Sequence, residues 1–314
     1  MKILISHLRQ NGDAVLSSVI YKLFKEKYPG CEIKLITGNY IIQELLRHNP
    51  YLDSIQVIES PYEADEVFES ERHKYDDAIR LLYWSNRGLS SWENSIMKSF
   101  VVSSGFTEKE AEGCCPKIYW TDEDLEKINK LMSKLEINLK SLVVGTLDED
   151  MFKYQETVRS WSIRNDLRFL RANIDFARRF NLNFREIGCL AANSLFAVGQ
   201  EGGWLHVAAC AGAKTVGFPR RINPLCAMPE YYHNKFRDQR MRHLSVHPPA
   251  EKQCGRYSSV IEQRPCNYLL NGDSSNIVHE DERSCFPKSF KCEETITEES
   301  INGVLDLAIS DLRQ

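Results

Sequence analysis

The chain has 314 residues, of which 42% are hydrophobic and 27% are charged, and its formal net charge at pH 7 is -4. This composition excludes a disordered or fibrous chain, and the net charge gives no general reason to expect nucleic acid or an anionic membrane as the main partner. The length predicts two domains of about 150 residues each.

The N-terminus starts directly with a strand pattern, KILIS, and lacks the basic stretch, apolar run and cleavage site of a signal peptide. The sequence has no run of about 18 apolar residues, as a membrane-spanning helix would need. We therefore expect a soluble, cytoplasmic protein without a membrane span. Ten cysteines in a reducing compartment predict thiols or metal ligands rather than a disulfide framework.

Strand and helix patterns alternate through the first half of the chain. After KILIS, apolar residues on one face predict a helix over 14–27, followed by the strand EIKLIT. Next come a helix at IIQELLRH, strands at SIQVIE and DDAIRLLYW, and a helix near 93–104. This order predicts a doubly wound α/β domain, with a largely parallel sheet covered by helices on both faces.

A second domain of the same kind is expected after the charged helix DEDLEKINKLMSKL. We place a Rossmann-like domain at 1–137 and another at 138–314, with a cleft between them. The second domain should contain a strand at LVVGT, a helix at about 165–180, an apolar strand at SLFAVG, a helix at HVAACAGA and a strand at KTVGF. A polar, cysteine-bearing tail then precedes a last amphipathic helix, EESINGVLDLAISDL.

The loop SHLRQNGDAV follows the first strand, and ligands of open α/β sheets bind at the carboxyl ends of the strands. Gly12 and Asp13 have two explanations: a tight turn with an aspartate helix cap, or a carboxylate that removes a proton from an acceptor hydroxyl. In the second case the rest of the loop would contact the acceptor or line the cleft, through His7, Arg9, Asn11 and Gly12.

A second loop, VGQEGGWLHVAACAG, leads from an apolar strand into a helix of small residues. Gly202 and Gly203 would let the backbone approach a ligand, and the start of the helix offers free N–H groups to a phosphate or diphosphate. The spacing is neither that of a dinucleotide-binding motif nor that of a P-loop. Glu201 and His206 flank the turn, either as ligand-binding groups or as caps and structural groups.

Arg159, two residues before Trp161, is a third candidate, because arginine can bind a phosphate or diphosphate group in bidentate fashion. The alternative is a solvated arginine at a helix start. Arg220 and Arg221 form a further basic pair with the same two explanations.

The tail contains four cysteines that could hold a structural zinc or iron ion, although no CxxC pair is present and reduced thiols are the simpler interpretation. They are Cys254, Cys266, Cys285 and Cys292.

Taken together, these segments resemble the heptosyltransferase family, glycosyltransferase family 9, of the GT-B fold. The opening MKILISHLRQNGDAVLSSVIYKLFKEKYPGCEIKLIT is similar to the family's first strand, Gly-Asp turn and helix, and HNPYLDSIQVI to its Asn-Pro-Tyr-Asp element. RSW stands where the family has a Lys-x-Trp element, and EGGWLHVAACAGAKTVGF resembles its Asp-x-Gly-x-x-His helix and following strand.

The resemblance implies an inverting transfer from a nucleotide-diphosphate sugar, with Asp13 as general base and no metal ion or other cofactor required. It places Arg159 on the diphosphate, and Glu201 and His206 near the donor sugar and phosphates. Two departures matter: Glu201 replaces the usual aspartate, and the segment between Arg159 and Glu201 is shorter by about a strand and a helix. The nucleotide base and the sugar are therefore left open.

The acceptor hydroxyl is also left open among a lipopolysaccharide sugar, a protein, a small molecule and a modified nucleobase. Two further functions fit the same architecture. One is a non-catalytic descendant that binds a sugar nucleotide or glycan, and the other is a nucleotide-sugar epimerase.

Overall fold

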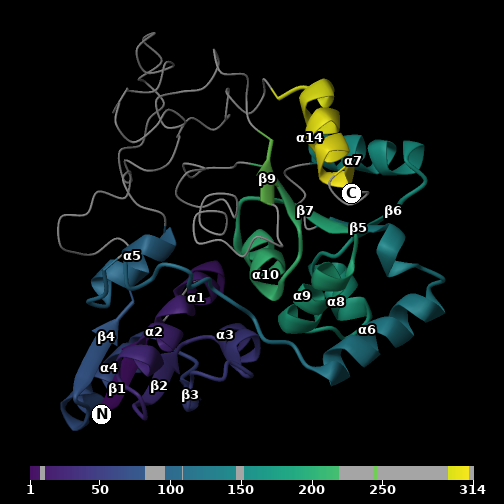
Figure 1. Ribbon diagram of the computed structural model, residues 1–314. Helices are drawn as coiled ribbons and strands as arrows, with labels where there is room; N and C mark the ends of the chain where they lie inside the picture. Colours follow the sequence, from purple (N-terminus) through teal and green to yellow (C-terminus); the bar gives the residue numbers. More distant parts are fainter. Residues whose placement is uncertain are drawn as a thin grey trace, which may run out of the picture.

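The computed structural model describes residues 1–7, 11–81, 96–107, 109–145, 152–218, 243–246 and 296–310. Within them the chain forms two lobes, each built on its own parallel sheet (Figure 1). This confirms the α/β class and the two doubly wound sheets that the sequence predicts.

The N-terminal lobe contains a four-stranded sheet of order β3-β2-β1-β4, in which every pairing is parallel. Apolar residues of both strand faces are buried, those of one face against α1, α2, α3 and α5 and those of the other against α4. The elements are β1 (Lys2–Ser6), α1 (Asn11–Ser17), α2 (Val19–Lys27), β2 (Glu32–Thr37), α3 (Tyr40–Leu46), β3 (Ser54–Val57), α4 (Pro61–Glu71), the 3-10 turn Arg72–Lys74, β4 (Asp77–Arg80) and α5 (Ile96–Ser103).

The C-terminal lobe contains a five-stranded sheet of order β6-β5-β7-β8-β9, again with parallel pairings throughout. One face packs on α7 and α14, and the other on α6, α8 and α9. The elements are α6 (Asp122–Lys134), the 3-10 turn Leu139–Ser141, β5 (Leu142–Gly145), α7 (Phe152–Arg164), β6 (Arg168–Arg171), α8 (Ile174–Arg179), α9 (Phe184–Asn193), β7 (Phe196–Gln200), α10 (Gly203–Ala211), β8 (Thr215–Phe218), β9 (His243–Ser245) and α14 (Glu298–Ser310).

The expected helix at about 165–180 is wrong. A helix over 152–164 and a shorter one over 174–179 flank the strand β6 instead. The first helix ends because Asp166 takes a positive φ of 57°, which breaks the α-helical path before the strand begins. The expected helix over 14–27 is likewise two helices, α1 and α2, which meet at Ser18.

The two lobes share buried surface through α10. Its residues Val207, Cys210 and Ala211 belong to the hydrophobic core of the N-terminal lobe. At the end of the same helix, the backbone N–H of Ile118 donates to the Cys210 carbonyl at 2.8 Å, and Trp120 Nε1 donates to the Ala211 carbonyl at 3.0 Å. The segment that joins the lobes is therefore bound to the C-terminal end of α10.

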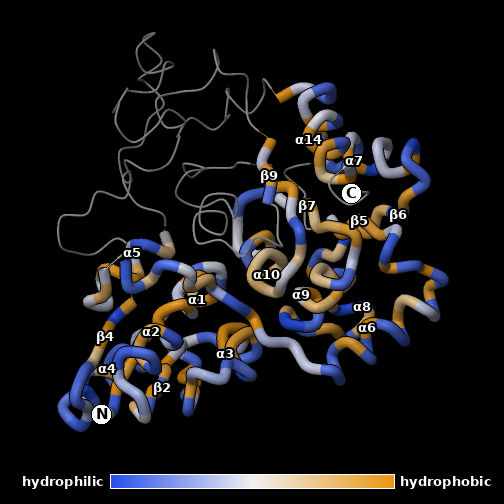
Figure 2. Tube along the Cα trace, in the orientation of Figure 1, coloured by the Kyte–Doolittle hydropathy of each residue, from blue (hydrophilic) through white to orange (hydrophobic). Residues whose placement is uncertain are grey.

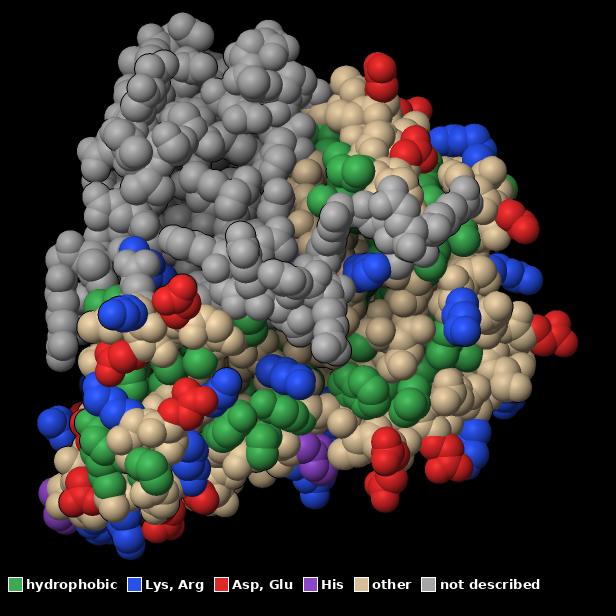
Figure 3. All heavy atoms as spheres, viewed as in Figure 1, with side chains coloured by type: hydrophobic (Ala, Val, Ile, Leu, Met, Phe, Trp, Pro, Cys, Tyr) green, Lys and Arg blue, Asp and Glu red, His purple; other side chains and the backbone are tan. Residues whose placement is uncertain are grey.

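Hydrophobic residues line the strands of both sheets and the helix faces that cover them (Figure 2). On the described part of the face in Figure 3, acidic and basic side chains are interspersed, in keeping with the small net charge of -4. The expected boundary at residue 137 stays a prediction. Helix α6 precedes it and packs against α9 in the core of the C-terminal lobe.

Candidate active site

The turn after β7 is the C-terminal lobe's contribution to the candidate site. Gly202 has a φ of 151°, a backbone conformation that favours glycine, and it precedes the nine-residue helix α10 without capping that helix by a side chain. Glu201 and His206 are 6% and 3% exposed, and His206 Nε2 lies 3.7 Å from Glu201 Oε1. The first turn of α10 therefore offers backbone N–H groups next to a buried carboxylate.

The loop after β1 is the contribution of the N-terminal lobe. Asp13 is the third residue of α1, so it lies inside the first helical turn rather than at the N-cap. Asn11 accepts a hydrogen bond from Asn39 Nδ2 at 2.8 Å, which joins the start of α1 to the start of α3. Within the described part of the chain, no group donates a hydrogen bond to the Asp13 carboxylate.

Gly12 and Gly203 bring the two loops into contact. A Cβ atom on Gly12 would lie 3.0 Å from Gly203 Cα and 3.0 Å from His206 Cδ2. Any larger residue at position 12 would push the start of α1 away from the start of α10. Because neither Gly12 nor Gly203 has a side chain, Asp13 and Glu201 can approach each other across the lobe boundary.

The electrostatics of Asp13 fit a general base. Its burial and, to a smaller extent, the negative charge of Glu201 raise the pKa of its carboxyl to about 7. A base with a pKa near the working pH accepts a proton most effectively in a transition state. The carboxylate would therefore be able to take a hydroxyl proton at neutral pH.

His7 lies at the carboxyl end of β1 and is 4% exposed. Neither ring nitrogen has a hydrogen-bond partner among the described residues, and the ring lies 5.9 Å from that of Phe100. Burial lowers the pKa of His7 to about 4, while the backbone of Asp13 raises this pKa to a smaller extent. The imidazole is therefore neutral at pH 7. Its contact with an acceptor stays a prediction.

Arg159 does not join this group. It lies two turns into α7, its side chain is 59% exposed, and its Nη1 lies 3.9 Å from Glu156 Oε1. Its neighbour Trp161 is buried and donates to Asp306 Oδ1 of α14 at 2.8 Å, so that the tryptophan serves the packing of α7 on α14.

Several predicted residues lie outside the described residues, namely Arg9, Arg220, Arg221 and the tail cysteines Cys254, Cys266, Cys285 and Cys292. Among the residues that are described, no three His, Cys, Asp or Glu side chains come together as metal ligands would. The described cysteines are free thiols. No described helix is both long enough and apolar enough to cross a membrane.

Sequence reasoning missed Arg185 of α9, which connects the lobes by donating to Asp124 of α6 and to the Glu44 carbonyl of α3. Arg185 and its partner Asp124 are 61 positions apart, and no local motif relates them. The helix starts on which they lie were detectable, since Thr121 with Asp124 and Asn183 with Glu186 form capping boxes.

No family model matches the chain, and no curated protein matches it. Solved structures do. A family 9 glycosyltransferase from Veillonella parvula superposes with a TM-score of 0.68 at 11% identity, covering 99% of this chain and 97% of that one. The chain has the GT-B fold. Escherichia coli ADP-heptose lipopolysaccharide heptosyltransferase II superposes over 100% of both chains, with a TM-score of 0.64 and 12% identity.

A third similar structure is the dodecameric iron-containing heptosyltransferase TibC of E. coli in complex with ADP-D-β-D-heptose. Its TM-score is 0.61 at 13% identity, with 99% of this chain and 76% of that chain covered. These likenesses confirm that the resemblance of the sequence motifs to heptosyltransferases extends to the fold of the whole chain.

Proposed function

We propose that this protein is a cytoplasmic, inverting glycosyltransferase that moves a sugar from a nucleotide-diphosphate donor to a hydroxyl acceptor. The observation that carries the proposal is the placement of Asp13. Its carboxyl, with a pKa of about 7, faces Glu201 and the start of α10 across the contact between Gly12 and Gly203. The fold, shared with heptosyltransferases, supports the same function.

In the proposed reaction Asp13 removes the proton of the acceptor hydroxyl. The hydroxyl oxygen forms a bond to the anomeric carbon from the face opposite the leaving group, and the bond from that carbon to the diphosphate oxygen breaks. The nucleoside diphosphate departs with the bonding electrons. The N–H groups and partial positive charge at the start of α10 stabilise its growing negative charge.

Glu201 and His206 are the proposed contacts to the donor sugar and phosphates, because both are buried at this helix start. The proposal needs no metal ion for the transfer. It assigns no step to Arg159, whose side chain is exposed on α7 and whose phosphate contact stays a prediction.

ADP-heptose is the first donor to test, because two of the similar structures carry that donor in their names. The longer side chain of Glu201 favours testing other ADP-, UDP-, GDP- and CDP-sugars beside it. A lipopolysaccharide core sugar is the first acceptor, and a protein, a small hydroxylated metabolite and a hydroxylated nucleobase follow.

A thermal-shift screen of nucleotide diphosphates and their sugars tests donor binding. A ligand at 100 times its Kd stabilises the native state by about 2.7 kcal/mol, which is a readily measured shift. A purified protein that no nucleotide sugar stabilises would contradict the proposal.

Turnover is then compared between the wild type, Asp13→Asn and the matched control Asp166→Asn. Removing a general base should lower kcat by about 10²–10⁴-fold while donor binding persists. Asp166 is an exposed residue with a φ of 57°, which asparagine adopts readily, so the control should retain full turnover. Wild-type protein that binds donor and transfers nothing to any acceptor would instead indicate a non-catalytic binding protein.

A further inference from the structure

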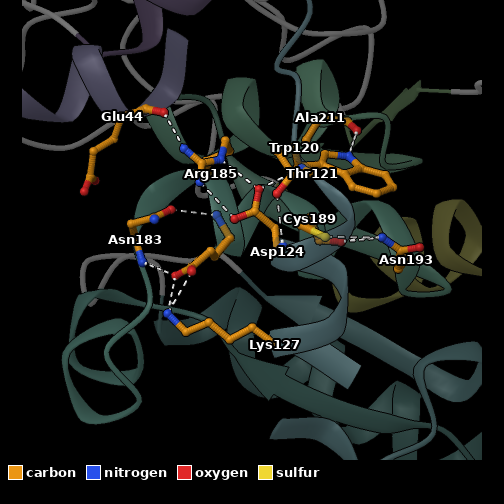
Figure 4. A network of polar contacts seen from close by, with 11 residues as sticks. Glu44, Trp120, Thr121, Asp124, Lys127, Asn183, Arg185, Cys189, Asn193 and Ala211 are labelled. Atoms are coloured by element: carbon orange, nitrogen blue, oxygen red, sulfur yellow. Dashed lines mark hydrogen bonds and ion pairs between the residues drawn. The ribbon is translucent and has the colours of Figure 1, made fainter. Parts of the chain in front are cut away.

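Arg185 connects three helices that belong to both lobes (Figure 4). It lies at the start of α9, is 7% exposed, and donates from Nε and Nη2 to the two carboxylate oxygens of Asp124 at 2.8 and 2.9 Å. Its Nη1 donates to the backbone carbonyl of Glu44 in α3 at 3.1 Å. One guanidinium therefore joins α9 and α6 of the C-terminal lobe to α3 of the N-terminal lobe.

Each partner has a physical reason to hold this side chain. The Glu44 carbonyl is one of the last four of α3, which the helix itself leaves without a partner, and the C-terminal end of a helix attracts a cation. Asp124 accepts the backbone N–H of Thr121 at 2.8 Å in a capping box at the start of α6. The planar, bidentate fit to Asp124 is one that lysine cannot reproduce.

This connection extends to the candidate site through α10. Helix α9 packs closely on α10, since a Cβ atom on Gly188 would lie 3.0 Å from the Ala211 Cβ. The C-terminal end of α10 is bound to Ile118 and Trp120 of the segment that joins the lobes. The other end of α10 carries Gly203, which contacts Gly12.

We propose that Arg185 is a positioning residue that sets how α10 sits against the N-terminal lobe, and so how Glu201 and His206 face Asp13. Its catalytic consequence rests on the proposed glycosyl transfer. The effect of Arg185 on the contact between the lobes is independent of that reaction, and it can be measured without any donor or acceptor.

The chain offers a matched control in the same network. Lys127 donates to both carboxylate oxygens of Glu186 at 2.7 and 2.9 Å (Figure 4). It also donates to the Asn181 carbonyl at 2.7 Å, and all of these groups lie in the C-terminal lobe. Lys127→Met therefore removes an ion pair to a buried partner without removing a hydrogen bond to the N-terminal lobe, whereas Arg185→Met removes both an ion pair and the hydrogen bond between the lobes.

The first measurement is amide hydrogen exchange of the ligand-free full chain over peptides that cover residues 115–121 and 203–211. Arg185→Met should speed exchange in both peptides, including at the Ile118 amide, because α9 and α10 lose their tie to α3. Lys127→Met should leave them at the wild-type rate. Equal rates in the two variants would overturn the proposal.

The second measurement uses turnover once a donor is known. Arg185→Met should lower kcat by about 10–100-fold with the Kd of the nucleoside diphosphate unchanged, since the nucleotide contacts lie in one lobe while the reacting groups lie in two. Arg185→Lys, which keeps the charge, should fold and recover part of the loss. If kcat falls to the same extent in Lys127→Met, Arg185 has a merely structural role. If the wild type transfers no sugar, the proposed function fails and the exchange data still decide the positioning role.

Discussion

Substituting Gly12 by alanine tests whether the lobes touch in solution as they do in the structure. Gly12 is inside a helix and has an ordinary backbone conformation, so helix propensity alone predicts a gain of up to about 1 kcal/mol for alanine. The new Cβ would lie 3.0 Å from Gly203 Cα, which is backbone, and 3.0 Å from the ring of the buried His206. Overpacking of this kind costs about 1–3 kcal/mol, so the net change should be a loss of about 0–2 kcal/mol.

Gly303→Ala is the matched control, because Gly303 also lies in a helix, α14, and its Cβ would meet nothing within 4 Å. This variant should gain about 1 kcal/mol in the free energy of unfolding. Urea unfolding of both variants, with m-values compared to the wild type, gives the two differences. A gain for Gly12→Ala equal to that of Gly303→Ala would mean that α1 and α10 are apart in solution, and the site as described would be refuted.

Three further outcomes follow from the described contacts. Asp13→Asn should stabilise the fold increasingly from about pH 4 to about pH 7 and then level off. Over this range wild-type stability falls, because the Asp13 carboxyl ionises in the unfolded state while it stays protonated in the native state; urea unfolding at several pH values would show the rise, and a constant difference would contradict it. In the proposed reaction, kcat/KM should rise about tenfold per pH unit below about pH 7 and reach a plateau above it, and a pH-independent profile would remove Asp13 as the base. Trp161→Phe should lower the free energy of unfolding by about 1.5–3 kcal/mol, because it removes the 2.8 Å hydrogen bond to Asp306. Asp306→Asn keeps an acceptor and should cost less, and urea unfolding measures both variants.

The two loops of the candidate site were predictable because parallel strands impose strong rules. The strand patterns KILIS and SLFAVG correspond to β1 and β7, and each leads into a helix through a loop with glycine and a carboxylate. Ligand sites of doubly wound sheets lie at these carboxyl ends, so the sequence alone points to Asp13 and Glu201. That the two would face each other needed the structure, since no sequence rule fixes how two lobes dock.

The errors have equally specific causes. Strand β6 has four residues, RFLR, at the edge of its sheet, and arginines at both of its ends hide the alternation that marks a strand. Helix α4 was missed although Ser60 caps it and Pro61 begins it, a combination typical of a helix start. The phosphate contact of Arg159, selected from its spacing to Trp161, stays a prediction; α7 begins at Phe152, which puts Arg159 on an exposed turn.

The arrangement around Asp13 is one that stability alone would not favour. The Asp13 carboxyl, to which no described residue donates a hydrogen bond, faces the buried carboxylate of Glu201, whose negative charge adds to desolvation in disfavouring ionisation of Asp13. At another point of the lobe boundary, the buried charges of Arg185 and Asp124 form a bidentate pair. The Asp124 carboxylate is satisfied by Arg185, whereas among the described residues the Asp13 carboxylate has no hydrogen-bond donor, so a ligand that supplies one would account for the difference. An acceptor hydroxyl would do so, and it would lose its proton to that carboxylate.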